Sequence, residues 1–272
     1  MDFDKDMLTY YNRGREQERL TVGLSQIEYL RTLDVLNRYL PAAPAIIYDI
    51  GSGPGRYALE LVKEGYELHL LDPVELHIQQ ASEALKDFKG ATFTQGDARQ
   101  LPYRDVSAHV VLLLGPLYHL QDKDDRLNVL REAARVLKKG GLLFAAAISR
   151  FAPLSLAFES LETSKADEAI PYLDTDILVS GKHNNPENLE GNFTTAYFHH
   201  PDEVDLEIKA AGFTLEKVIA LEGVAGITRD ACALLDNQEK LEKVLDLLRK
   251  LETEKNLMGV SPHILAVAKK PG

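Results

Sequence analysis

The sequence has no tryptophan and only one cysteine, Cys232, among its 272 residues. A single thiol cannot form an internal disulfide, and it excludes zinc and iron–sulfur sites that are built from several cysteines. No apolar run approaches the roughly 20 residues that a membrane-spanning helix needs. Residues 1–6 are acidic and polar, unlike a signal or transit peptide, so we expect a cytoplasmic protein without a membrane segment.

Acidic side chains outnumber basic ones. The chain has 31 Lys and Arg against 42 Asp and Glu, which gives a formal net charge of -11. Because Lys and Arg neutralise the phosphates in nucleic-acid complexes, we do not expect a nucleic-acid partner. The hydrophobic content of 45% is sufficient for one large domain or for a core with an added lid. Nothing in the composition predicts an oligomeric state.

A buried strand that runs into a glycine turn and then into a helix is predicted by residues 46–55, IIYDIGSGPG. Glycines at positions 51, 53 and 55 allow positive φ angles and keep Cβ atoms away from a ligand. The first N–H groups of the following helix point at the same place. A dinucleotide-binding turn needs the spacing G-x-G-x-x-G, but Arg56 occupies the position of the third glycine.

Strands and helices alternate up to residue 148, which predicts a parallel, doubly wound α/β sheet. Further strands are expected at 67–72, 91–95, 110–114 and 142–148. Asp72, at the carboxyl end of the second strand, can accept both ribose hydroxyls of an adenosyl or a dinucleotide ligand, or it can cap the next helix. The apolar run at 110–114 is typical of a central strand buried on both faces, and it places Gly115 to His119 beside the ligand.

Four features in order resemble the class I S-adenosylmethionine-dependent methyltransferases: the glycine turn, Asp72, Gly96-Asp97-Ala98, and the passage from Arg135 to Gly141. The resemblance implies a seven-stranded, mostly parallel sheet whose sixth and seventh strands form an antiparallel pair. It also implies S-adenosylmethionine as the cofactor, with Asp97 bonded to the adenine amino group and the N–H of Ala98 to a ring nitrogen. Enzymes that methylate adenine or glutamine amides have Asn/Asp-Pro-Pro-aromatic where this chain has Gly115-Pro116-Leu117-Tyr118, which argues against that subclass.

The site implied by this resemblance draws on the glycine turn, the strand ends and the N-terminal segment. In similar enzymes that segment folds across the cofactor, so Tyr11 and Arg19 are assigned to its methionine end. The predicted cofactor-binding residues are Tyr11, Arg19, Asp49, Gly51, Ser52, Gly53, Gly55, Asp72, Pro73, Asp97, Ala98, Leu114 and Gly115.

Two residues are candidates for catalysis. A histidine ordinarily titrates near neutral pH, so His119 could take a proton from the acceptor, while Tyr118 could orient the acceptor or stack on adenine. The alternative is that His119 caps or packs the next helix. No metal site is predicted, because the adjacent residues His199 and His200 do not face the same way on a helix or a strand.

Residues 149–199 have weak periodicity and scattered Gly, Pro and Asn, which is typical of a functional lid. Candidate acceptor contacts in this lid are Arg150, Tyr172, His183, Tyr197 and His199. The predicted organisation is an N-terminal helical cap at 1–45, a core at 46–148 and 200–270, and the lid at 149–199. A second insertion is expected between strands six and seven. Capping boxes predict helix starts at Ser25-x-x-Glu28 and at Asp236-x-x-Glu239.

The sequence therefore predicts an enzyme that moves the methyl group of S-adenosylmethionine to an O, N or S nucleophile of a small molecule. Two alternatives stay open. One is a nicotinamide-dependent oxidoreductase, which the missing third glycine disfavours. The other is a regulator that binds S-adenosylmethionine without catalysis, since the fold alone does not establish an activity.

Overall fold

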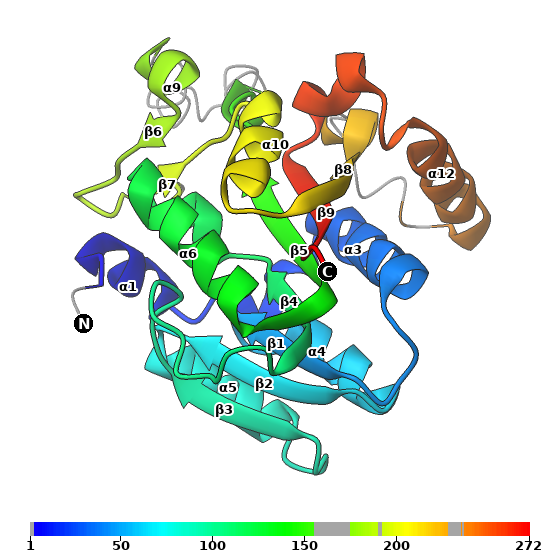
Figure 1. Cartoon of the computed structure of the whole chain (residues 1–272). Coiled ribbons are helices and arrows are strands. Elements are labelled where there is room, and N and C mark those ends of the chain that lie inside the picture. Colours follow the sequence, from blue (N-terminus) through cyan, green and yellow to red (C-terminus); the bar gives the residue numbers. More distant parts are fainter. Residues whose placement is uncertain (1–2, 155–174, 190–191, 228–234, 236) are drawn as a thin grey trace.

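The computed structural model describes residues 3–154, 175–189, 192–227, 235 and 237–272. One seven-stranded sheet forms its centre, in the order β3-β2-β1-β4-β5-β9-β8 (Figure 1). The strands of this sheet are β1 (Ile46–Ile50), β2 (Glu67–Asp72), β3 (Ala91–Gln95), β4 (Ala108–Leu113), β5 (Leu137–Ile148), β8 (Thr214–Ala220) and β9 (His263–Lys269).

The sheet is parallel from β3 to β5 and antiparallel at its other edge. β9 pairs antiparallel with both β5 and β8, so the last strand of the chain is inserted between them. The predicted seven-stranded, mostly parallel sheet with an antiparallel final pair is thereby confirmed. Sheets of the dinucleotide-binding type have the order 3-2-1-4-5-6, without such an inserted strand.

Helices cover both faces of the sheet. One face carries α3 (Ser25–Tyr39), α4 (Arg56–Lys63) and α5 (Glu75–Ala84), and the other carries α6 (Lys123–Val136) and α10 (Pro201–Ala210). In β4, Val111 packs into one layer and Leu112 into the other, and both are fully buried. Burial on both faces explains why this strand is apolar from Val110 to Leu113.

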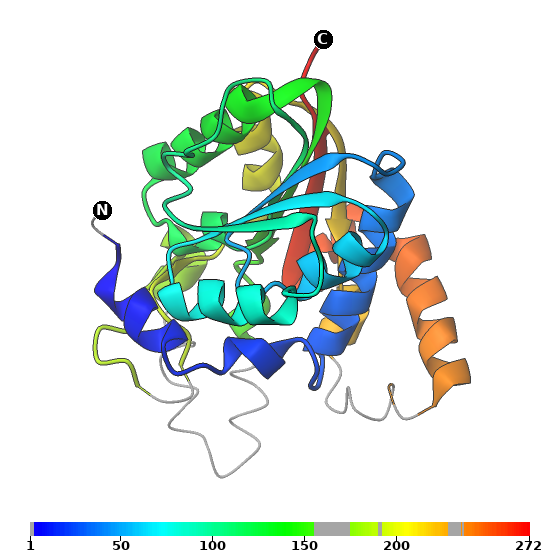
Figure 2. The same ribbon diagram turned by 90° about the horizontal axis from the view of Figure 1, so that it is seen from below.

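The N-terminal segment contains α1 (Lys5–Tyr11) and α2 (Glu16–Arg19), which run alongside α5 (Figure 2). The prediction of a capping box at Ser25 is wrong. The N-cap residue of α3 is Leu24, with no side-chain cap, because the Glu28 carboxylate binds Arg19 instead.

The remaining elements lie outside the main sheet. The N-cap of α12 (Gln238–Leu251) is Asn237, whose side chain accepts from the N–H of Lys240, and the predicted cap residue Asp236 lies outside the described residues. The other elements are the 3-10 helices η1 (Pro116–His119), η3 (Gly223–Ile227) and η4 (Lys255–Val260), helix α9 (Thr175–Ser180), and the two-stranded sheet of β6 (Lys182–His183) and β7 (Ala196–Tyr197).

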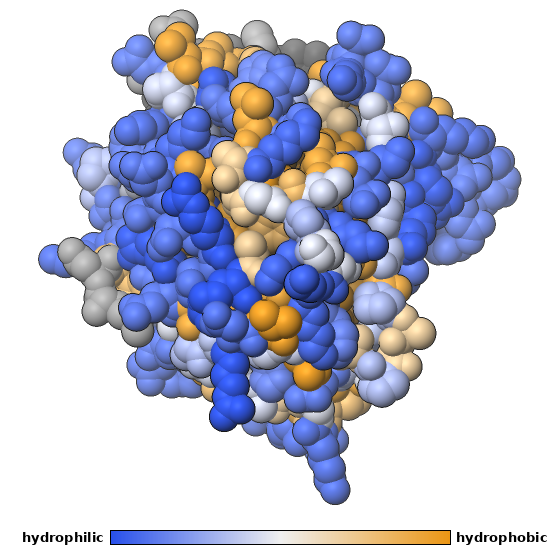
Figure 3. All heavy atoms as spheres, in the orientation of Figure 1, coloured by the Kyte–Doolittle hydropathy of each residue, from blue (hydrophilic) through white to orange (hydrophobic). Residues whose placement is uncertain are grey.

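The surface is mostly hydrophilic on the face of Figure 3, although a band of more apolar residues crosses its middle. Within the described part of the chain, no helix has the length and apolarity needed to cross a bilayer.

Replacing Leu112 with Ala tests the burial of β4. The side chain has no exposed surface, so its truncation should lower the free energy of unfolding by about 2–5 kcal/mol in urea titrations. Leu247→Ala is the matched control, because Leu247 is 50% exposed and should cost within about 0.5 kcal/mol. Equal costs at the two positions would contradict the central position of β4.

Candidate functional site

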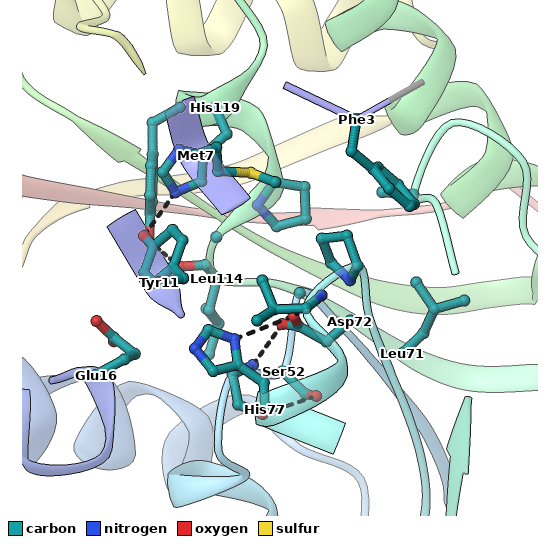
Figure 4. Close-up of a pocket in the computed structure, with 18 of the residues that line it drawn as sticks. Phe3, Met7, Tyr11, Glu16, Ser52, Leu71, Asp72, His77, Leu114 and His119 are labelled. Carbon is teal, nitrogen blue, oxygen red and sulfur yellow. Dashed lines mark hydrogen bonds and ion pairs between the residues drawn. The ribbon is translucent and has the colours of Figure 1, made fainter. Parts of the chain in front are cut away.

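A cavity of about 680 Å³ lies at the carboxyl ends of β1, β2 and β4, and the N-terminal segment forms part of its wall (Figure 4). This volume is typical of small-molecule sites. Fourteen of the predicted cofactor and catalytic residues line it: Tyr11, Arg19, Asp49, Gly51, Ser52, Gly53, Asp72, Pro73, Asp97, Ala98, Leu114, Gly115, Tyr118 and His119.

The glycine turn forms one side of this cavity. Gly51 and Gly53 have positive φ angles of 72° and 54° and lie in the wall. A Cβ on Gly51 would lie 2.7 Å from the Cδ of Pro116, so any larger residue would push apart the turn and the end of β4. Gly55 is not among the lining residues, and the space beside it is filled by Ala81 of α5 and by Leu85, the C-cap of that helix.

Three hydrogen bonds fix the carboxylate of Asp72. Its Oδ2 accepts from the N–H of Gly53 at 2.8 Å, and its Oδ1 accepts from the N–H of Val74 at 2.9 Å. The Nδ1 atom of His77 lies 3.1 Å from the same Oδ1. These donors come from the glycine turn, the β2–α5 connection and α5, so the orientation of Asp72 is set by three parts of the fold.

Asp49 gives the same wall a second carboxyl group. Burial, followed by the charge of Asp72, raises the pKa of Asp49 to about 7. This group therefore changes its protonation near neutral pH, and a cation in the cavity would favour its ionised form.

Arg99 donates hydrogen bonds to the carboxylate of Asp97, the residue that is predicted to bind adenine. Its Nε lies 3.1 Å from both carboxylate oxygens and its Nη2 lies 2.7 Å from Oδ2, while Nη1 reaches Asp125 at 3.1 Å. Burial alone would raise the pKa of Asp97, but the hydrogen bonds from Arg99 outweigh it and the pKa is lowered. Asp97 is therefore held ionised, as an acceptor of hydrogen bonds.

The two candidate catalytic residues are held differently. The Oη atom of Tyr118 donates to the carbonyl of Leu114 at 3.0 Å, and the Nε2 atom of His119 lies 2.8 Å from the Oη of Tyr11. Burial lowers the pKa of His119 to about 4, so its imidazole is neutral near pH 7. His119 does not cap the next helix, since the N-cap of α6 is Asp122.

Arg19 connects the cavity wall to the last strand through a chain of ion pairs. Its guanidinium binds Glu16 at 2.7 Å and Glu28 at 2.6 Å. Glu28 in turn lies 3.7 Å from the Nδ1 of His263, which is 2.6 Å from Glu222. Burial would lower the pKa of His263, but Glu28 and Glu222 raise it to about 9.

Glu28, Glu222 and His263 are close enough together to ligate a metal ion. Their ligand atoms already have partners, because the imidazole carries its proton at neutral pH and the guanidinium of Arg19 neutralises Glu28. Metal binding requires a deprotonated histidine. We therefore interpret the group as an ion-pair network.

The predicted acceptor contacts lie elsewhere. Arg150, His183, Tyr197 and His199 are not among the lining residues, and Tyr172 falls outside the described residues. Arg150 and Tyr197 both bind Glu203, and the Arg126 guanidinium lies 3.7 Å from the centre of the Tyr197 ring. They form a buried cluster beside α10, and the described residue of segment 149–199 that reaches the cavity is Thr195.

The cavity also contains residues that the sequence did not single out. Phe3 and Met7 enter it from the N-terminal segment, and His77 enters it from α5 (Figure 4). Arg99, which follows β3, also lines it. The side chain of His77 is 3% exposed and lies in the wall. Its position in the first turn after the strand that ends at Asp72 is the signal that could have identified it.

Comparisons with known proteins give a family match for one part of the chain. Residues 47–141 match the family model described as a methyltransferase domain. The 27-O-demethylrifamycin SV methyltransferase of Amycolatopsis mediterranei is 33% identical over 103 residues, which are 36% of this chain and 36% of that protein. The demethylmenaquinone methyltransferase of Thermotoga maritima is 32% identical over 111 residues, which are 40% and 46% of the two chains. The chain thus spans less than half the length of these curated relatives.

A solved structure is similar over most of the chain. The S-adenosylmethionine-dependent methyltransferase from Mesorhizobium loti aligns with a TM-score of 0.60 and 16% identity, and it covers 90% of this chain and 100% of its own. Identity this low shows the fold alone. Together with the domain match, it confirms the family resemblance that the motifs predicted.

The network around His263 should make stability depend on pH. The folded pKa of about 9 lies above the unfolded value of about 6.5, so the stabilisation is complete below pH 6.5 and is lost as the pH rises toward 9. From this pKa difference, we expect the free energy of unfolding measured in urea titrations to fall by up to about 3 kcal/mol between pH 6.5 and 9.

His263→Gln should remove this dependence. His109→Gln is the control. Burial and Lys138 lower the pKa of His109, so the contribution of this histidine to the pH dependence of stability lies at acidic pH. If the pH dependence between 6.5 and 9 survives in His263→Gln, the charged network is refuted.

Proposed function

We propose that this chain, a class I S-adenosylmethionine-dependent methyltransferase by its domain family and its fold, moves the methyl group of S-adenosylmethionine to an oxygen, nitrogen or sulfur nucleophile of a small molecule. The observation that carries the proposal is the cavity where the glycine turn, Asp72 and Asp97 meet at the carboxyl ends of the strands. This is where ligands of open α/β sheets bind.

The cavity residues fit the proposed cofactor. Gly51 lets the turn pack against Pro116, and the space beside Gly53 is open, so that the backbone can approach a ligand closely there. Asp72 would accept a hydrogen bond from the ribose, and Asp97 with Ala98 would bind the adenine. Other lining residues complete the proposed cofactor site: Tyr11, Arg19, Asp49, Ser52, Pro73, Leu114 and Gly115.

The charge of the cavity also supports a cationic cofactor. Asp49 and Asp72 line one wall, and burial together with the charge of Asp72 raises the pKa of Asp49 to about 7. A positively charged ligand would counteract that charge. Binding near pH 7 should therefore release part of the proton held by Asp49.

The oxidoreductase alternative has less support. Arg56 replaces the third glycine of the dinucleotide fingerprint, and β9 is inserted antiparallel between β5 and β8. Neither feature fits a sheet of the dinucleotide-binding type.

The residues of this chain would act mainly by positioning. When bound, the cofactor supplies a methyl group on a sulfonium, which is already a good leaving group, so alignment of the acceptor accounts for most of the rate. With a pKa of about 4, His119 is a weak base near pH 7. It holds the hydroxyl of Tyr11 in the wall, where the oxygen of this hydroxyl can accept a hydrogen bond from the acceptor and so orient it.

We assign the acceptor side of the cavity to the region around Thr195, within the proposed lid at 149–199. The amide of Gln121, itself a lining residue, donates to the carbonyls of His183 at 2.7 Å and Ala196 at 3.1 Å. These bonds tie β6 and β7 to the wall. The cluster of Arg150, Tyr197 and His199 would then influence the acceptor only through the placement of this segment.

Calorimetry with S-adenosylmethionine, S-adenosylhomocysteine and NADH tests the cofactor. Both adenosyl ligands should bind, and Asp72→Ala should weaken them at least tenfold, because the variant loses the ribose acceptor and the contact with Gly53. Asp87→Ala, at an exposed turn, is the control and should bind as the wild type does. Binding of NADH alone would refute the proposal.

His119→Ala tests the acceptor side. With an acceptor found by screening metabolites against isotopically labelled S-adenosylmethionine, kcat should fall at least tenfold while the Kd of S-adenosylhomocysteine stays within about twofold. Tyr11→Phe should lower kcat in the same direction, because it removes the hydroxyl that His119 holds. An unchanged kcat in both variants would remove the pair from the reaction, and binding without methylation of any metabolite would favour the regulator.

A further inference from the structure

His77 is a buried histidine in the cavity wall to which the proposed roles above assign nothing. It stands in the first turn of α5, is 3% exposed, and lies between Asp72 and Tyr11 (Figure 4). Its ring meets the Tyr11 ring edge to face, with the centroids 5.2 Å apart. It therefore links the strand end that holds Asp72 to the N-terminal segment.

The neighbours of His77 determine which of its nitrogens carries the hydrogen. Asp72 already accepts from the N–H groups of Gly53 and Val74, so its oxygens act as acceptors here. The hydrogen shared between His77 and Asp72 must then stand on Nδ1. In the neutral imidazole this leaves Nε2 with a free lone pair, ready to accept a hydrogen bond.

Nε2 has no hydrogen-bond partner among the described residues, although it is buried. A buried acceptor without a donor costs free energy, and such an atom in the wall of a ligand cavity is matched to a donor on the ligand.

The acceptor capacity of Asp72 indicates what that donor is. A carboxylate offers about four lone-pair sites, and the N–H groups of Gly53, Val74 and His77 occupy three of them. One site is left for a ligand. A ribose presents two neighbouring hydroxyls, so the second hydroxyl needs another acceptor in the same wall.

We propose that His77 is a cofactor-binding residue that shares the ribose with Asp72, its Nδ1–H orienting the carboxylate and its Nε2 accepting a hydrogen bond from one ribose hydroxyl. The inference rests on the proposed function, because it takes the ligand to be an adenosyl compound. It replaces a single acid that holds both hydroxyls with a pair of residues that each hold one.

Two variants separate the two nitrogens. His77→Asn keeps a short amide donor for Asp72 and removes the acceptor at Nε2, whereas His77→Phe keeps the ring against Tyr11 and removes both nitrogens. His77→Asn should keep the thermal midpoint of the wild type and weaken S-adenosylhomocysteine about tenfold in calorimetry. His77→Phe should weaken it at least as much.

The hydroxyl is identified with two analogues of S-adenosylhomocysteine that lack either the 2′- or the 3′-hydroxyl. Against the wild type, each analogue should bind about tenfold more weakly than the parent compound. With His77→Asn, one analogue should bind less than twofold more weakly than the parent compound, because this variant no longer contacts the hydroxyl that the analogue lacks. The other analogue should still bind about tenfold more weakly. In the wild type, the ¹⁵N resonance of the His77 Nε2 should also shift when S-adenosylhomocysteine is added.

The outcomes distinguish this inference from the proposed function. A wild-type protein that does not bind S-adenosylhomocysteine refutes the proposed function itself. Tight binding by the wild type, with the same affinity in His77→Asn and His77→Phe, leaves the function in place and overturns the role of His77. Losses for both analogues that are as large in His77→Asn as in the wild type also overturn it. If His77→Phe does not fold, the comparison with His77→Asn decides the question.

Discussion

The structure depends on how closely the glycine turn approaches its neighbours. Gly51 faces Pro116 at the end of β4 with no room for a side chain, and Gly55 lets α5 pack against the start of α4. Between them, the N–H of Gly53 donates to Asp72, so the turn and the second strand hold each other in place. The cavity exists because these contacts bring three strand ends together without filling the space above them.

Charge pairing, rather than apolar packing alone, attaches the N-terminal segment to this site. Arg19 of α2 is tied to Glu28 of α3, and Glu28 faces the protonated His263 of β9. Buried charges are tolerated only when they are paired, so a change at any member leaves a partner uncompensated. The wall of the cavity is therefore coupled to β9, the last strand of the chain, through this network of charges.

Local features of the sequence predicted the strands, the glycine turn and the acids at the strand ends, because each depends on residues that are close in sequence. Predictions failed where the role of a residue depends on a partner that is far away in the sequence. Glu28 was assigned to a capping box, but Arg19 binds it. His77 and Arg99 were missed, since their roles depend on Asp72, Tyr11 and Asp125. The candidate acceptor contacts in 149–199 were chosen by residue type, and ion pairs with α10, which the sequence does not reveal, place several of them in a buried cluster.

In the function that we propose, the methyl donor binds on the glycine-turn side of one cavity and the acceptor binds on the side of His119 and Thr195. A crystal structure with S-adenosylhomocysteine tests this division most directly. It should show the adenosine between the turn at Gly51–Gly53, Asp72 and Asp97, with the sulfur directed toward His119. Electron density for the ligand at any other place on the molecule, or in the reverse orientation within the cavity, would contradict the account.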